Sequence, residues 1–242
     1  VVNNPGMNAL PESSAPLLHI EGGVATITLN RPQHRNRLED GDLLTLLAHI
    51  ATANADLSVR ALVLTARPNQ PRPVFSAGYH LGAFSDDGET GPMPFETVPD
   101  ALASARPVTL CALSGSVYGG ATDLALACDF RLGVSTLELR MPAARLGLHY
   151  YPSGLVRYVS RLGLQAAKRL FLLAEAVPAE GLLALGYLDA LVAPEALDAE
   201  VARHADALAA NALAPPSSPP AAKPCRQRAR TRMDVAHTPN VA

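Results

Sequence analysis

Two adjacent glycines, Gly119 and Gly120, stand directly before an apolar run that is typical of a buried helix. Glycine lets another molecule approach the main chain closely, and the first N–H groups of a helix have no partner within it. The helix dipole adds partial positive charge there. This pattern predicts a site for an anion, or for an oxygen that gains charge during a reaction. A plain tight turn, with Asp123 as a stabilising first-turn acid, explains the same residues without a ligand.

A second turn of small residues lies in the stretch FSAGYHL, residues 75–81. It follows a predicted strand and loop, and it also offers exposed main chain. Two backbone donors from separate turns that converge on one carbonyl oxygen would form an oxyanion hole. Such a hole stabilises the negative charge that develops on a carbonyl oxygen.

Other kinds of site fit the sequence poorly. Neither the phosphate-binding nor the dinucleotide-binding glycine pattern is present around Gly119, and the serine of GSVYG is misplaced for a hydrolase nucleophile. We find no cluster of cysteine and histidine with metal-ligand spacing, so we expect no metal site. The net charge of −2 and the pI near 6.4 give no reason to expect a nucleic-acid partner. Cys111 and Cys128 lie in apolar runs and read as buried thiols in a reducing compartment.

Strands and helices alternate along the first part of the chain. Residues 17–32 predict two strands joined at a glycine turn, residues 40–54 a helix and residues 60–66 a buried strand. The order repeats with a strand at 107–115, a helix at 119–128 and short strands to Pro142. This alternation predicts an α/β layered fold. From Ser153 the pattern becomes helical, with helix starts at Ser153 and at Pro178–Glu180.

Four segments together resemble one family. TLNRPQHRN, VFSAGYHL, ALSGSVYGGATDLALACDFRLG and MPAARLGLHYYPSGLVRYVSRLG, in this order and spacing, are similar to the crotonase superfamily of enoyl-CoA hydratases and isomerases. The resemblance covers residues 17–213. It implies a spiral of ββα units with a helical C-terminal region, a homotrimer or hexamer, and an acyl-CoA thioester as substrate. Coenzyme A enters as part of this substrate, and no separate cofactor is expected.

The resemblance also assigns catalytic roles. It places the two backbone donors at Tyr79 and Gly120, and the first catalytic carboxylate at Asp123, where the family has glutamate. Aspartate is one methylene shorter, and an error of about 1 Å in placement can cost about a hundredfold in rate. The second carboxylate falls on Ala143, which has no titratable group. The candidates to replace it are His149, Tyr150 and Tyr151 in the stretch LGLHYYPSG, then His80 and Glu138. The alternative is that Tyr150 and Tyr151 pack beneath the helix that begins at Ser153, and that His80 is a solvated loop residue.

Further residues are assigned to substrate and CoA binding. The loop after Pro32 corresponds to the segment along the nucleotide, although a solvent-facing Arg35 explains that residue as well. The SAG turn would frame the adenine and the pantetheine, and the stretch 84–99 would shape the acyl pocket. The full expected set is Gln33, His34, Arg35, Ser76, Ala77, Gly78, His80, Leu81 and Gly119.

The expected organisation has four parts: an N-terminal extension (1–16), the ββα core with the CoA and oxyanion site (17–152), a helical region (153–213) and a disordered proline- and arginine-rich tail (214–242). No apolar stretch approaches the roughly 20 residues that cross a bilayer, and the start does not resemble a secretory signal. We therefore expect a cytoplasmic protein without a membrane partner.

The sequence favours an enoyl-CoA hydratase-like lyase that stabilises a thioester enolate. Two alternatives stay open. One keeps the oxyanion hole but performs isomerase, decarboxylase or thioesterase chemistry. The other is an acyl-CoA-binding protein without catalysis, which Ala143 and the atypical tail favour.

Overall fold

The chain begins with a hairpin and a helix. The computed structural model describes residues 14–69, 71–80 and 94–211. Strands β1 (Leu17–Glu21) and β2 (Val24–Leu29) pair in antiparallel fashion around the predicted glycine turn. The short 3-10 helix η1 (Pro32–His34) and helix α1 (Asp40–Ala55) follow. A reciprocal capping box between Glu39 and Asp42 fixes the start of α1.

Three units of two strands and a helix follow the hairpin. They are β3 (Ala61–Ala66), β4 (Val74–Ser76) and α2 (Thr97–Ala103); β5 (Val108–Leu113), β6 (Ser116–Tyr118) and α3 (Gly120–Ala127); and β7 (Phe130–Val134), β8 (Glu138–Arg140) and α4 (Pro152–Leu162). In each unit the first strand joins a six-stranded sheet and the second a four-stranded sheet. This repeating path is the predicted spiral of ββα units, and the α/β fold class is confirmed.

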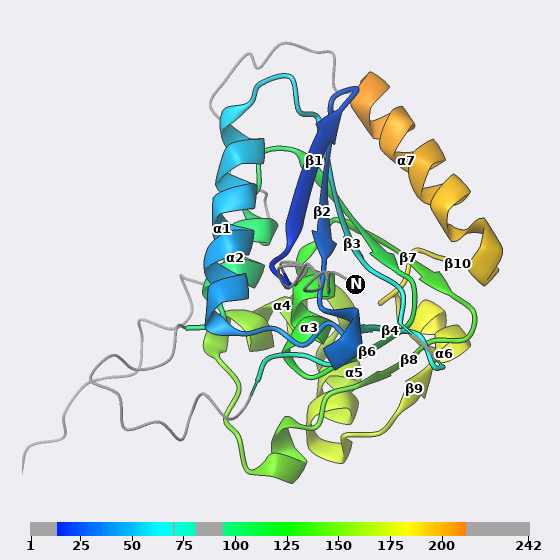
Figure 1. The fold of residues 1–242 in the computed structure, drawn as a ribbon. Helices are drawn as coiled ribbons and strands as arrows, with labels where there is room; N and C mark the ends of the chain where they lie inside the picture. Colours follow the sequence, from blue (N-terminus) through cyan, green and yellow to red (C-terminus); the bar gives the residue numbers. More distant parts are fainter. Residues whose placement is uncertain (1–13, 70, 81–93, 212–242) are drawn as a thin grey trace, which may run out of the picture.

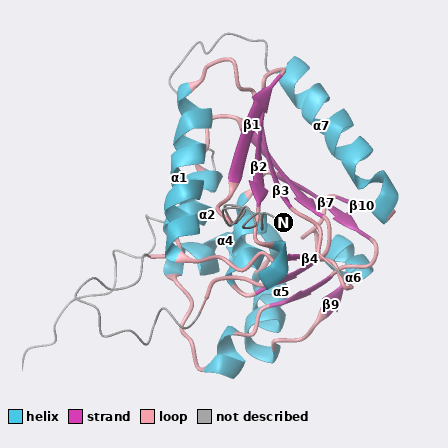
Figure 2. Cartoon of the chain, in the orientation of Figure 1, coloured by secondary structure: helices cyan, strands magenta, loops and turns pink. Residues whose placement is uncertain are grey.

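The two sheets are mainly parallel. The larger has the order β1-β2-β3-β5-β7-β10 and is parallel from β2 onward; the smaller has the order β4-β6-β8-β9 and ends in an antiparallel pair. Because β3 and β5 are covered on both faces, nearly all their residues are buried. Helices α1 and α2 lie on one side of the larger sheet and α7 (Leu197–Asn211) on the other (Figures 1 and 2).

The C-terminal part is mostly helical. It contains η3 (Ala143–Leu146), α5 (Leu164–Lys168), the π-helical turn η4 (Arg169–Leu173), α6 (Ala179–Ala184) and η5 (Pro194–Ala196). Two short strands that the sequence did not indicate, β9 (Val177–Pro178) and β10 (Ala190–Val192), extend the sheets. Among the described residues, no helix is both long enough and apolar enough to span a bilayer.

The predicted N-cap at Ser153 is wrong. Tyr151 is the N-cap residue of α4, and Pro152 occupies its first turn, where the fixed φ angle of proline suits a helix. Pro178 was expected to be the first residue of the helix, but it is the N-cap residue of α6. Both starts lie close to the predicted positions because proline cannot continue a helix from the preceding turn.

Helix α3 lies at the centre of the molecule (Figure 1). Every residue of α3 after Gly120 is buried. It packs against α2, α4 and β6. Its N-terminus carries the glycines and the acid that the sequence singled out, so the fold places those groups between the core helices and the smaller sheet.

Candidate active site

The two predicted turns lie against each other. A Cβ atom on Gly78 would be 2.7 Å from the carbonyl oxygen of Tyr118 and 3.2 Å from the backbone nitrogen of Gly120. The φ angle of Gly78 is +90°, which a residue with a side chain rarely adopts. Only glycine therefore allows the SAG turn to come this close to the start of α3.

Tyr79 is held between two elements. It forms a parallel bridge with Leu38, in which the Leu38 N–H donates to the Gly78 carbonyl and the His80 N–H donates to the Leu38 carbonyl, each at 2.9 Å. In this ladder pattern the N–H of the bridged residue points away from the partner strand. The Tyr79 hydroxyl donates to Asp40 in α1. Burial, and then Asp40, raise the pKa of this phenol well above its usual range.

Gly119 and Gly120 form the first turn of α3. Gly119 has a φ angle of +54°, and its N–H donates to the Arg140 carbonyl at 3.0 Å, which ties the turn to β8. A Cβ atom on Gly120 would be 2.8 Å from Cε1 and Cζ of Phe95. The Phe95 ring thus covers the Cα of Gly120, and its centroid is 5.5 Å from that of Tyr79. Phe95 belongs to the stretch 84–99 that the resemblance assigned to the acyl pocket, of which residues 94–99 are among those that the structure describes.

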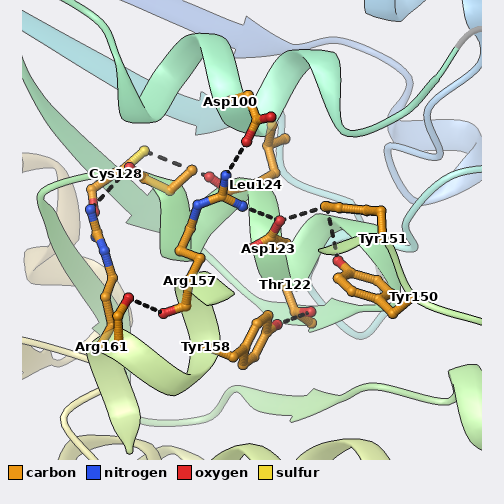
Figure 3. Close-up of polar contacts among 12 residues, drawn as sticks. Asp100, Thr122, Asp123, Leu124, Cys128, Tyr150, Tyr151, Arg157, Tyr158 and Arg161 are labelled. Carbon is orange, nitrogen blue, oxygen red and sulfur yellow. Dashed lines mark hydrogen bonds and ion pairs between the residues drawn. The ribbon is translucent and has the colours of Figure 1, made fainter. Parts of the chain in front are cut away.

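Asp123 is fully buried, and its two oxygens differ. Oδ2 accepts hydrogen bonds from the Tyr151 hydroxyl, at 2.5 Å, and from Nη1 of Arg157 (Figure 3). Oδ1 has no hydrogen-bond partner within the described part of the chain. Burial raises the pKa of this carboxyl and outweighs Arg157 and Tyr151, both of which lower it.

Arg157 connects Asp123 to a second acid. Its Nη2 donates to Oδ1 of Asp100 in α2 at 2.5 Å, and its side chain is 8% exposed. The Asp123 charge raises the pKa of Arg157 despite its burial. No local pattern indicates this pair, because Arg157 lies 34 residues after Asp123 and within an amphipathic helix.

The candidates for the missing second carboxylate are placed very differently. Tyr150 stacks on Tyr151, with ring centroids 4.2 Å apart, and its hydroxyl donates to the Tyr151 hydroxyl at 3.0 Å. His149 is exposed, and Ala143 is buried in η3. Glu138 accepts a hydrogen bond from Tyr118 at 3.0 Å. Of these groups, the structure brings Tyr150 into the hydroxyl and carboxylate cluster around Asp123.

Comparison with known proteins decides the family. The sequence profile of "Enoyl-CoA hydratase/isomerase" matches residues 19–222. The chain belongs to the enoyl-CoA hydratase/isomerase family. It is 29% identical over 194 residues to a crotonyl-CoA hydratase of Syntrophomonas wolfei, covering 76% of this chain and 72% of that protein. It is 30% identical over 182 residues to the peroxisomal multifunctional protein MFP2 of Arabidopsis thaliana, covering 72% of this chain and 24% of MFP2. The chain thus spans about a quarter of the length of that relative.

Solved structures agree. An enoyl-CoA hydratase from Mycobacterium marinum superposes with a TM-score of 0.72 at 28% identity, covering 81% of this chain and 92% of that one. An enoyl-CoA hydratase/isomerase from Pseudoalteromonas atlantica gives 0.74 at 25% identity, covering 84% and 79%. The predicted membership of the crotonase superfamily is confirmed.

The residues that the family resemblance assigned to CoA lie on adjoining loops. Gln33, His34 and Arg35 are exposed on and after η1, and the N–H of Ala77 donates to the Arg35 carbonyl at 2.9 Å. Ala77 is exposed, whereas His80 is half-buried and Leu81 lies outside the described residues. These loops therefore form one continuous edge beside Gly78.

Two buried side chains hold this edge together. Ser76 Oγ donates to the Asn36 carbonyl at 2.7 Å and accepts the Gly78 N–H at 3.1 Å. Asn36 bonds to the main chain of three other residues: its Nδ2 donates to the carbonyls of Arg67 (2.9 Å) and Val74 (3.4 Å), and its Oδ1 accepts the Arg31 N–H (3.0 Å). Sequence reasoning missed Asn36. The features that mark Asn36 are its burial and its φ angle of +50°, and both are visible only in the structure.

The remaining residues of note lie outside the cluster. Cys111 and Cys128 are buried free thiols. Arg145 reaches the Leu173 carbonyl at 3.4 Å from an exposed position. Within residues 14–69, 71–80 and 94–211, no three His, Cys, Asp or Glu side chains are grouped to hold a metal ion. The chemistry that the described site offers is one buried carboxylate, two tyrosine hydroxyls and the N-terminus of α3.

Proposed function

We propose that this enzyme binds an acyl-CoA and stabilises the thioester enolate with the backbone N–H groups of Tyr79 and Gly120. The observation that carries the proposal is the contact between the SAG turn and the start of α3, where a Gly78 Cβ would lie 3.2 Å from the Gly120 nitrogen. Gly120 supplies a first-turn N–H, to which the helix dipole adds partial positive charge. Removing one such donor costs about 3 kcal/mol of transition-state stabilisation in enzymes of this kind.

The reaction that we propose is the addition of water to a 2-enoyl-CoA. The water oxygen bonds to Cβ while its proton passes to Asp123, and the C=C electron pair moves into the thioester to form the enolate. Asp123 then returns this proton to Cα. One carboxylate performs both transfers, because position 143 holds alanine. Burial raises the pKa of Asp123, which brings a carboxyl closer to the range that suits proton transfer in both directions.

Coenzyme A enters as part of the substrate, and the proposed reaction uses no other cofactor. We propose that its nucleotide lies along the exposed edge formed by Gln33–Arg35 and Ala77. The guanidinium of Arg35 suits a phosphate group.

The family resemblance suggests a trimer or hexamer, and we propose a homo-oligomer. Apolar side chains left exposed on the helical region support this: Leu155, Val159, Leu164, Leu172 and Leu173 are each 40% or more exposed. Light scattering of the purified chain measures the oligomeric state.

A second candidate is a different reaction in the same oxyanion hole: isomerisation or decarboxylation through an enolate, or thioester hydrolysis through a tetrahedral oxyanion. The engagement of Asp123 by Arg157 and Tyr151 favours it, because both bonds weaken the carboxylate as a base. The same observation is compatible with acyl-CoA binding without catalysis.

An assay of the hydration of a short enoyl-CoA tests the proposal. The loss of absorbance of the conjugated thioester measures the reaction. We expect turnover by the natural chain and a loss of 100-fold or more in kcat for Asp123→Asn, the range for removing a general acid–base group. Asp206→Asn, an exposed acid on α7, is the matched control. Full activity in Asp123→Asn would remove Asp123 from the reaction. A panel of other acyl-CoA thioesters and calorimetric CoA binding separate the second candidate from binding alone.

A further inference from the structure

The two oxygens of Asp123 have different surroundings, although the whole side chain is buried. Oδ2 takes both hydrogen bonds, whereas Oδ1 has none among the described residues. A buried carboxylate oxygen without a donor is rare, because desolvation is not compensated there. Such an oxygen needs a partner that the described residues do not supply.

Both donors to Oδ2 are themselves held in place. Arg157 is fixed from the other side by Asp100, at 2.5 Å (Figure 3). The Tyr151 hydroxyl accepts the hydroxyl of Tyr150 at 3.0 Å, so its own proton is directed to Asp123. The Tyr151 ring packs against Phe95, with centroids 6.2 Å apart. The carboxylate therefore has little freedom to exchange its oxygens by rotation.

Asp123 also lies on the same face of the helix as the proposed donor. Residues three apart are neighbours on a helix surface, and Asp123 is three residues after Gly120. Phe95 covers the Cα of Gly120 and contacts Tyr151, so the hydroxyl, the carboxylate and the start of α3 form one cluster.

We infer that Tyr151 is a positioning residue for Asp123: together with Arg157 it occupies Oδ2 and leaves Oδ1 to exchange the proton with the substrate. This inference rests on the proposed function. The proton that Oδ1 takes from water is the same proton that it returns to Cα, so the hydration gains and loses no proton overall. Tyr151 keeps its own proton throughout, because burial and Asp123 raise the pKa of its phenol far above its usual range.

The direction of the expected pH effect follows from the contacts. The Tyr151 hydrogen bond stabilises the charged form of Asp123 and lowers its pKa. Its removal by Tyr151→Phe raises that pKa, so the carboxylate needs a higher pH to ionise. The other charged or titratable groups facing Asp123 are still present in this variant: Arg157 and Tyr158 from α4, Asp100 from α2, Tyr187, and Tyr150 from the segment before α4. Of these, Tyr150 loses its acceptor, the Tyr151 hydroxyl.

Two readouts test the inference on the full chain. In the pH profile of kcat/KM, we expect the acidic limb of Tyr151→Phe to move up by about one pH unit, the effect of one hydrogen bond to a charged group. We expect kcat to fall while KM for the acyl-CoA changes little. Infrared titration of the buried carboxyl, assigned by its absence in Asp123→Asn, should show the same shift without any substrate.

Tyr118→Phe is the matched control, because it removes a hydroxyl that donates to another carboxylate, Glu138, at 3.0 Å. We expect it to leave the Asp123 titration where it is. Phenylalanine at 151 keeps the ring contacts with Tyr150 and Phe95, and urea unfolding checks that the variant is folded.

An infrared midpoint that does not move in Tyr151→Phe overturns the inference, whatever the activity. A shifted midpoint with an unshifted kinetic limb also overturns it, because Asp123 would not be the group that exchanges the proton. Absence of turnover by the natural chain on every thioester contradicts the proposed function instead.

Discussion

At the scale of single residues, the site depends on two glycines whose neighbours differ in kind. At Gly78 the atoms that a side chain would meet belong to the main chain of Tyr118 and Gly120. At Gly120 they belong to the ring of Phe95. The main-chain atoms of a sheet or a helix cannot move aside easily. A side-chain ring can be removed by substituting its residue. The two positions should therefore respond differently to the same added methyl group.

We predict that Gly120→Ala destabilises the fold by about 1–3 kcal/mol, the usual cost of overpacking, and that adding Phe95→Leu restores much of this loss. Gly78→Ala should cost at least as much, because its φ angle is also positive, and Phe95→Leu should not rescue it. Urea unfolding of the four variants measures these differences. Equal rescue of both glycine variants would contradict the assignment of Phe95 as the neighbour of Gly120.

Part of the candidate site could be predicted from the sequence alone. Gly78, Tyr79, Gly120 and Asp123 belong to short contiguous motifs, so their types and spacing were visible. Arg157 was not, because an arginine in an amphipathic helix reads as a solvent-exposed charge until the contact with Asp123 is known. Such contacts follow from tertiary packing and leave no local pattern.

At the scale of elements, the loop after β2 and the turn after β4 are joined by Asn36. This buried side chain bonds to the main chain of Arg31, Arg67 and Val74, and its own carbonyl accepts the Ser76 hydroxyl. Its φ angle of +50° is one that asparagine tolerates better than most residues. Asn36 therefore sets the distance between the proposed CoA edge and the SAG turn.

We predict that Asn36→Ala lowers the free energy of unfolding by about 2–4 kcal/mol, since it removes buried hydrogen bonds and adds backbone strain. Asn36→Gly removes the same bonds without the strain, so it should cost about 1 kcal/mol less. Both should weaken acyl-CoA binding, which calorimetry measures. If the alanine and glycine variants were equally stable, the left-handed backbone at this position would carry no cost.

The length of an element mostly decided whether the sequence revealed it, and the exception is the three-residue strand β8 (Glu138–Arg140), which was predicted. Strands β2, β3 and β5 have six residues each with alternating or continuous apolar character, and α1 has sixteen residues, so all were predicted within one or two residues. Strands β4, β6, β9 and β10 have two or three residues each, too few for a periodicity. Helix α2 was missed because Pro99 lies inside it and reads as a break.

At the scale of the whole molecule, the ββα repeat brings turns from different units to one place. The second strand of each unit joins the smaller sheet, so the ends of β4 and β6, at Ser76 and Tyr118, are neighbours although they lie far apart in the sequence. The order of strands and helices predicted the layers. The pairing of short strands that places Gly78 beside Gly120 followed only from the family resemblance, because local patterns carry no information on register between distant segments.

A ligand that contacts both turns and the η1 loop should stabilise the whole fold, because those parts belong to different units. Binding to the native state alone adds about 2.7 kcal/mol at a ligand concentration one hundred times Kd. For a chain of this size, each kcal/mol raises Tm by roughly 2–4 °C. We therefore predict a rise of about 5–10 °C with a saturating acyl-CoA, measured by thermal unfolding.

Free CoA should give a smaller rise, because it lacks the thioester oxygen that the Tyr79 and Gly120 donors would bind. Gly78→Ala should reduce the acyl-CoA shift to that of free CoA, since the added methyl group displaces the SAG turn from α3 and not from the η1 loop. Equal shifts for CoA and acyl-CoA in the natural chain would show that the two turns do not hold the thioester.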